Sequence, residues 1–378
     1  MKRLSEVSIL MHFADIEDPR IERTKKHLLS DIISLAICAV IAGADGWEEI
    51  EDFGHDKFEW LKKFLRLPNG IPSHDTISRL FRRIKPKAFQ ECFLDWTQAL
   101  HEQLGRKHVA IDGKTLRSSH DRNMAKNALH LVSAWSVENH LTLGQEAVDE
   151  KSNEITAIPE LLQLLALEGA IVTIDAMGCQ KNIAEQIVKQ EADYVLAVKA
   201  NQPTLHAALQ EHFTHLHDTD FTDAEVRRYN TRQNAHGREE ERCYYVSPVP
   251  ESLRLAGDDW TGLQSVGQVI SITQRDGKEV SDVRYYITSL PVRVKAFASA
   301  VRGHWGIENS LHWVLDVTFD EDRSRIRKDH GPENFALLRR IATSVIKQDT
   351  SSKQSIKRTR KRAGWNNQNL LKALTARP

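Results

Sequence analysis

Cysteine is scarce in this sequence, and the few that occur lie far apart. Of 378 residues only four are cysteines, namely Cys38, Cys92, Cys179 and Cys243, and no two of them form a Cys-x-x-Cys pair. This spacing predicts reduced thiols in a cytosolic protein and offers no zinc knuckle.

Long apolar runs are also missing. The longest run, residues 32–44, has about 13 residues and is flanked by Asp31 and Asp45, whereas a membrane-spanning helix needs about 20. The run predicts a buried helix that ends at Gly43. The first residues, MKRLSEVSILMHFADIED, contain acids that interrupt any apolar core, so we expect no N-terminal signal. A cytoplasmic protein without a membrane partner follows from both points.

Net charge is absent as well, since Lys+Arg and Asp+Glu both total 52. The balance therefore neither favours nor excludes a nucleic-acid partner, but the distribution of the basic residues is uneven. Residues 350–378 contain eight basic residues and no acidic one, and a second basic cluster covers residues 79–87. Each patch is compatible with a solvated face or a tail, and also with a surface for phosphates.

Residues 1–100 predict a helical domain. Within PSHDTISRLFRRI, Ser73 is a natural N-cap and the apolar residues recur at helical spacing. The basic residues of this segment occupy its other faces. A helix-turn-helix that contacts DNA and a helical domain with a merely solvated basic face both remain open; the basic residues are Arg79, Arg82 and Arg83.

From residue 107 the pattern changes to strands. HVAIDGKTL and ALHLVSAWSVENHLTLGQEAV predict three strands, and helices then alternate with the strands AIVTIDA and DYVLAVK. This β-β-β-α-β-α-β order is that of an RNase H-like core with a mixed sheet flanked by helices. We expect the first part of the core at 107–204, a β-rich insertion at 205–290 containing an Asp276-Gly277 hairpin, the second part at 291–346 and a basic tail at 347–378.

Two aspartates end two of the predicted strands. Asp112 follows an apolar run in HVAIDGKTLR, and Asp175 follows another in AIVTIDAMG. If the two strands are neighbours, both carboxylates emerge at one edge of the sheet, where two like charges are disfavoured unless a cation neutralises them. Mg²⁺ and Mn²⁺ prefer such oxygen ligands. A purely structural role as turn residues is the alternative, and the matching contexts favour metal.

Glu308 lies in RGHWGIENSLHW, which predicts a helix. On a helix His304, Glu308 and His312 share one face because they are four residues apart. A contact between Glu308 and a histidine or arginine would satisfy the carboxylate within the fold. Zinc is a further possibility, although the His-Glu-x-x-His arrangement is absent. With the two aspartates present, completion of a divalent metal site by Glu308 is the favoured interpretation.

At this point the sequence resembles a known family. The strings PSHDTISRLFRRI, DGKTLRSS, TIDAMGCQKNIAEQI, DYVLAVKANQP, NAHGREEERCYYV and RGHWGIENSLHWVLDVTFDEDRSRIRKDHGPENFALLRRIA resemble the H-repeat-associated insertion-sequence transposases. These belong to the DDE class with an RNase H-like core, and the match runs from about Phe13 to Ala342. The resemblance implies that Asp112, Asp175 and Glu308 form a catalytic triad that holds two Mg²⁺ or Mn²⁺ ions.

The residues around Glu308 depart from a pattern seen in some relatives. Leu315 stands where a lysine is expected, and His304 where an arginine is expected, so other side chains are needed to hold the phosphates. Asp316 is the alternative acid if Glu308 is structural. Near the metal site the candidates for phosphate contacts are Lys114, Lys199, Arg302, His304, Arg323 and Arg325.

The resemblance implies a transposase that cuts DNA at the ends of its own element and joins them to target DNA by phosphodiester hydrolysis and transesterification. Double-stranded DNA would be the partner, with the protein associated with the nucleoid when bound, and transposases of this kind usually act as multimers. Two alternatives stay open: a non-catalytic DNA-binding descendant of a transposase, and a metal-dependent nuclease.

Overall fold

The computed structural model describes residues 9–13, 16–104, 108–120, 127–148, 153–222, 225–235, 238–255, 260–275, 278–349 and 354–375. By its contacts the chain divides into two compact units. Unit 1 contains Met1–Gly105, Gly113–Lys151 and Glu308–Pro378, and unit 2 contains Arg106–Asp112 and Ser152–Ile307. Each unit is therefore assembled from segments that are distant in sequence.

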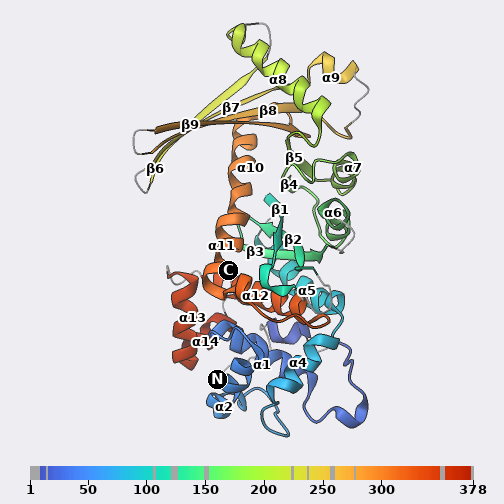
Figure 1. Cartoon of the computed structure of the whole chain (residues 1–378), viewed down its shortest axis with the longest axis vertical. Coiled ribbons are helices and arrows are strands. Elements are labelled where there is room, and N and C mark those ends of the chain that lie inside the picture. Colours follow the sequence, from blue (N-terminus) through green and yellow to red (C-terminus); the bar gives the residue numbers. More distant parts are fainter. Residues whose placement is uncertain are drawn as a thin grey trace. The chain divides into compact units, whose positions relative to one another are not determined.

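A mixed sheet runs through the fold (Figure 1). Its strand order is β3-β2-β1-β4-β5-β9-β8-β7-β6. Strands β1, β4 and β5 are parallel, whereas β3 pairs antiparallel with β2, and β9 with β5. The order β3-β2-β1-β4-β5 is that of an RNase H-like core, which confirms the predicted fold class. The strands of this core are β1 (His108–Thr115), β2 (His130–Ser136), β3 (Leu141–Ala147), β4 (Ile171–Ile174) and β5 (Asp193–Val198).

The predicted β-rich insertion forms four strands that extend the same sheet. They are antiparallel to their neighbours, and β8 and β9 stay in register up to the pair Arg275–Lys278. The Asp276-Gly277 hairpin that was predicted between them lies outside the described residues. The four strands are β6 (Arg227–Ala235), β7 (Arg238–Pro248), β8 (Ser265–Arg275) and β9 (Lys278–Thr288), accompanied by α8 (Pro203–Asp218) and α9 (Glu251–Leu255).

The remaining helices of unit 2 cover the sheet. Phe297 of helix α10 packs among Tyr244, Tyr286 and Val269 of the insertion strands. Gly267 makes this packing possible, because a Cβ there would lie 2.4 Å from the Phe297 ring. The bounds are α6 (Glu154–Gln163), α7 (Lys181–Lys189) and α10 (Val294–Ile307).

Unit 1 is largely helical. Helix α1 is buried along nearly its whole length and ends at Gly43, whose φ of 125° suits glycine, as predicted. Helix α12 is also buried and packs on α1. The predicted cap of α4 is present, with Ser73 Oγ accepting from the Thr76 N–H. The bounds are α1 (Leu29–Ala42), α2 (Trp47–Asp56), α3 (Phe58–Leu61), α4 (His74–Arg83), α5 (Pro86–Leu104), α11 (Trp313–Phe319) and α12 (Gly331–Lys347).

The C-terminal segment differs from the predicted basic tail. It folds into two helices, α13 (Ile356–Trp365) and α14 (Asn367–Leu374), which pack on each other and on α1 (Figure 1). Within the described part of the chain no single helix has the length and apolarity to cross a membrane. The pair α1 and α2, bent by 94°, passes that criterion only when the two are joined.

Candidate functional site

The two predicted aspartates belong to unit 2 and follow paired residues of two neighbouring strands. Strands β1 and β4 are parallel neighbours, and their last paired residues are Ile111 and Ile174. Asp175 follows β4 directly, at the carboxyl end of a parallel strand, where ligand sites of α/β sheets lie. Asp112 follows the last residue of β1 that pairs with β4, but β1 itself continues to Thr115, so this aspartate lies within the strand rather than at its predicted end.

Asp175 is held by the turn that follows β4. Its Oδ1 accepts from the N–H groups of Met177 at 3.0 Å and Gly178 at 3.4 Å. The turn is tight, because a Cβ on Gly178 would lie 2.3 Å from Cγ2 of Ile174. Burial raises the pKa of Asp175, and the nearby Glu154 raises it further, against these two N–H groups and Lys199. A cation close to this carboxylate would favour its charged form.

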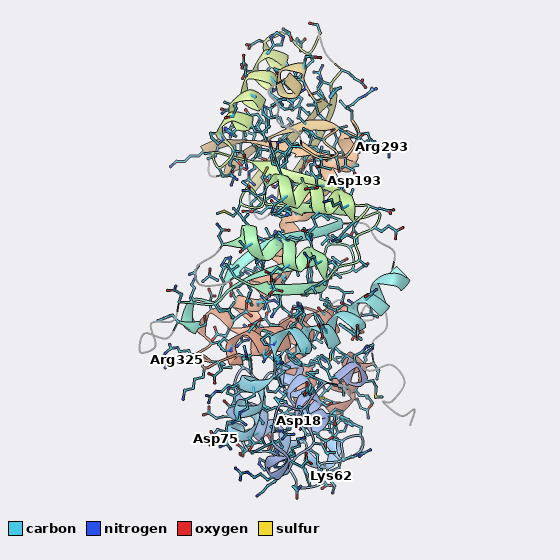
Figure 2. All side chains as sticks on the ribbon, turned by 90° about the vertical axis from the view of Figure 1, so that its right-hand side faces the viewer. Asp18, Lys62, Asp75, Asp193, Arg293 and Arg325 are labelled. Carbon is cyan, nitrogen blue, oxygen red and sulfur yellow. The ribbon has the colours of Figure 1, made fainter. Side chains whose placement is uncertain are left out.

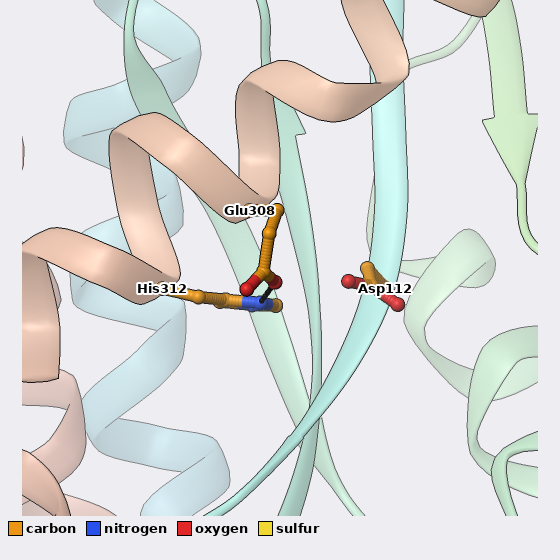
Figure 3. Close-up of side chains that lie close together, drawn as sticks. All are labelled: Asp112, Glu308 and His312. Atoms are coloured by element: carbon orange, nitrogen blue, oxygen red, sulfur yellow. Dashed lines mark hydrogen bonds and ion pairs between the residues drawn. The ribbon is translucent and has the colours of Figure 1, made fainter. Parts of the chain in front are cut away.

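Glu308 opens a π-helical segment, Glu308–His312, directly after α10. His312 Nδ1 lies 3.1 Å from Oε2 of Glu308 (Figure 3). This hydrogen bond is the largest cause of a lowered pKa for Glu308, with burial opposing it and Lys114 adding to it. The predicted Glu–His contact is therefore present, and it keeps the carboxylate ionised rather than consuming both of its oxygens. Asp112 is drawn in Figure 3 on strand β1.

Lys114, two residues after Asp112, is buried in an ionic cluster of unit 1. Its Nζ lies 2.7 Å from Oδ1 of Asp316, 3.0 Å from Oδ1 of Asp322 and 3.8 Å from Oε2 of Glu321. Glu321 in turn accepts from Arg340 at 3.0 Å, and both of these side chains are fully buried. The predicted phosphate ligand Lys114 and the alternative acid Asp316 are thus engaged with each other.

The cluster contains residues that sequence reasoning did not find. Asp322 and Glu321 lie in a short 3-10 turn, Glu321–Arg323, after α11, and Arg340 lies in α12. They meet Lys114 only through the tertiary fold, since 208 residues separate Lys114 from Asp322. No spacing in the sequence encodes this meeting.

His304 takes part in a chain of polar side chains inside unit 2. Its Nδ1 lies 3.0 Å from Oγ1 of Thr173, and the same oxygen lies 2.7 Å from Nε2 of His108. Burial lowers the pKa of His108 to about 3, and the neighbouring His304 adds to this lowering. Nearby on α10, Arg302 donates from Nη2 to Oε1 of Gln233 at 2.7 Å. The predicted phosphate ligands on α10 therefore have partners within the protein.

The other predicted phosphate ligands lie at the surface. Arg79 and Arg83 are exposed on α4, while Arg82 forms an ion pair with Asp329. Lys199 is exposed directly after β5. Arg325 is also exposed (Figure 2). Arg323 is exposed as well, although it lies 3.6 Å from Asp320.

The sheet places the chain in the RNase H-like class, with one aspartate in its first strand and one directly after its fourth. Two family models give the family. Residues 103–345 match the model of the transposase DDE domain, and residues 10–97 match a model described as DDE_Tnp_1-associated. The chain belongs to the transposase DDE domain family. This confirms the family resemblance inferred from the sequence motifs.

Named relatives cover almost the whole chain. The protein named "Putative transposase YncI" from Escherichia coli O157:H7 is 44% identical over 96% of this chain and 93% of its own length. The "H repeat-associated putative transposase YhhI" of Escherichia coli strain K12 is 42% identical over 97% of both. A solved structure, a piggyBac transposase synaptic complex with hairpin DNA, covers 97% of this chain and 79% of its own at 11% identity and a TM-score of 0.41. A similarity that low identifies no shared function.

Proposed function

We propose that this protein is a DNA transposase whose carboxylates Asp112, Asp175 and Glu308 act together on phosphodiester bonds. The observation that carries the proposal is the register of β1 and β4. Their last pair, Ile111 and Ile174, is followed by Asp112 within β1 and by Asp175 directly after β4.

The donor set fits hard divalent cations. Three carboxylates provide the oxygen ligands that Mg²⁺ and Mn²⁺ prefer. Burial raises the pKa of Asp175, an effect that a nearby cation would oppose, and the hydrogen bond with His312 lowers the pKa of Glu308. Paired metals, when bound, would activate the attacking oxygen and stabilise the leaving one.

The protein side chains would position the ligands. The N–H groups of Met177 and Gly178 fix the orientation of Asp175, and His312 fixes that of Glu308. Outer partners of this kind orient the ligands and tune their basicity. The cluster around Lys114 ties β1, which carries Asp112, to the turn Glu321–Arg323 and to α11, the helix that follows the Glu308 segment.

The partner would be double-stranded DNA, at the ends of the element and at the target. Exposed cations such as Arg79, Arg83, Lys199, Arg323 and Arg325 would contact phosphates, which makes binding salt-dependent. The protein would work in the cytoplasm at the nucleoid. It would act as a homo-oligomer, because two element ends have to be handled together.

The test uses the purified full-length protein, DNA that flanks its gene, and Mn²⁺ or Mg²⁺. Asp112→Asn, Asp175→Asn and Glu308→Gln should each lower cutting by roughly 10³-fold or more, since each removes a ligand of the proposed site and the metals are expected to contribute several kcal/mol. Glu185→Gln is the matched control, because Glu185 is an exposed helical carboxylate that pairs with Lys189. It should cut like the wild type.

Three results would overturn parts of the proposal. Equal cutting by the acid variants and the control would remove the triad. DNA binding without metal-dependent nicking by the wild type would identify a non-catalytic descendant. Nicked products that are never joined to target DNA would identify a nuclease.

A further inference from the structure

Helix α13 is fixed against unit 1 by a buried arginine. Arg360 donates to the carbonyl oxygen of Val40 at 3.1 and 3.2 Å and to that of Ala44 at 3.3 Å, and it pairs with Asp45 at 2.9 Å. Its guanidinium also lies 4.0 Å from the ring centroid of Phe319. The orientation of α13 is therefore set by contacts on one face.

A close approach between the backbones of α13 and α1 fixes the same face of α13. A Cβ on Gly364 would lie 2.6 Å from the carbonyl oxygen of Ala42, the last residue of α1. Ile356 and Ala363 are buried beside Arg360. Because helical residues three, four and seven apart share a face, these residues define the inner side of α13 and leave the opposite side outward.

The outward side carries cations and one aromatic ring. Lys357, Lys361 and Trp365 follow one another at intervals of four residues, and Arg358 lies next to them. We call these four residues the basic face. Its lysines and Arg358 are exposed, and Trp365 is 76% exposed. Within the part of the chain that the structure describes, no ion pair links these cations to a carboxylate.

This arrangement is electrostatically unfavourable for an isolated helix. Lys357 and Lys361 are like charges four residues apart, which destabilise a helix. Lys357 and Arg358 also lie in the first turn, where the helix dipole favours anions, and α13 has no acidic residue there. A polyanion bound to the basic face would reverse both effects.

We propose that the basic face of α13 is a contact surface for the phosphate backbone of duplex DNA. Lys357 and Lys361 are about 6 Å apart along the helix axis, and a duplex presents one charge per roughly 1.7 Å of its axis. Each cation therefore has a phosphate within reach, while the Trp365 ring at the end of the stripe packs on the sugar–base surface. The choice of DNA as the partner in this inference rests on the proposed function. It assigns a surface beyond residue 345, where the matched family model ends.

The test measures DNA binding by the full-length protein as a function of salt. The probe is a fluorescent duplex of arbitrary sequence, and the variant is Lys357→Ala/Arg358→Ala/Lys361→Ala. Three lost phosphate contacts should lower the slope of log affinity against log salt by about 2.7. Between 50 and 200 mM salt the wild type should then lose about 40-fold more affinity than the variant.

Stability and a matched charge removal serve as controls. Alanine has a high helix propensity and the variant removes like-charge repulsion, so its Tm should equal or exceed that of the wild type. Lys372→Ala removes a cation from the neighbouring helix, where Lys372 already lies 3.7 Å from Asp349, and should leave the slope unchanged. Trp365→Ala should weaken binding by up to roughly tenfold with the slope unaltered.

An unchanged slope in the triple variant overturns the inference. A basic helix can also adsorb to membranes. The inference is therefore also overturned if the three cations are needed for binding to anionic phospholipid vesicles but not for affinity to the duplex. Failure of the proposed function gives a different pattern. In that case the wild type does not cut DNA in Mn²⁺ or Mg²⁺, whereas the slope still depends on the basic face.

Discussion

Strand β1 begins in neutral polar surroundings and ends in ionic ones. At its start His108 shares Thr173 with His304, and burial keeps His108 uncharged. At its end Lys114 is surrounded by three carboxylates, and one of these, Glu321, pairs with the buried Arg340. Asp112 lies between the two regions on the same strand.

The difference shows two ways to satisfy buried polar groups beside one candidate site. The neutral region contains His108, whose pKa burial lowers, so it is sensitive to acid. The ionic region depends on the balance of opposite charges, so it is sensitive to the removal of any one partner. Both keep β1 in place, and they should fail under different conditions.

The largest effect is expected in the ionic region. Arg340→Met leaves the fully buried Glu321 without its 3.0 Å partner and should lower the free energy of unfolding by about 3–5 kcal/mol. Arg339→Met is the matched control. Arg339 is the preceding residue, equally buried but stacked on Phe335 and without an ion pair among the described residues. Urea unfolding should show a clearly smaller loss for the control, and equal losses would contradict the argument.

An intermediate effect is expected in the neutral region. The pKa of His108 is about 3 in the folded protein and near 6.5 when unfolded, so the unfolded chain binds the extra proton first as the pH falls. Stability is therefore complete above pH 6.5 and declines below it, by about 2 kcal/mol between pH 7 and pH 5. His108→Gln should remove this part of the pH dependence in thermal unfolding. A Tm that falls as steeply in the variant would show that other groups, His304 among them, dominate.

The smallest effect concerns the salt dependence of DNA binding, which should not involve the buried ionic region of β1. Lys114→Met should leave the salt slope of DNA binding unchanged, because its ammonium is buried among Asp316, Asp322 and Glu321. Lys199→Ala is the comparison, since Lys199 is exposed, and a lost phosphate contact lowers the slope by about 0.9. If Lys114→Met had a lower salt slope than the wild type, the result would instead support the prediction from the sequence that Lys114 contacts a phosphate.

The sequence predicted the core strands for a local reason, although Asp112, which was expected to end its strand, lies within β1. Apolar runs that end in Asp112 and Asp175 carry the strand signal and the candidate ligand in the same few residues. The order of the strands then implied that β1 and β4 could be neighbours. The assignment of Glu308 was less local, because its helix signal was clear but its role came from the family resemblance.

Other features could not be predicted, because their contacts are long-range. Lys114 and Arg340 lie in segments with no shared pattern, and only folding brings both of them to Glu321. Helix α13 was missed for a different reason. Its central buried position is Arg360 rather than an apolar residue, so the usual stripe is absent and the composition resembles that of a tail.

The same Arg360 ties helix α13 to the buried helix α1. The final carbonyl groups of a helix have no partners within it, and Arg360 adds a side-chain donor to the carbonyl oxygen of Val40, which also accepts from the Gly43 N–H at 3.4 Å. A frameshift or stop codon upstream of α13 would therefore expose the end of a buried helix. Copies of the gene that lose α13 would encode a destabilised protein, even though every proposed catalytic residue is still present.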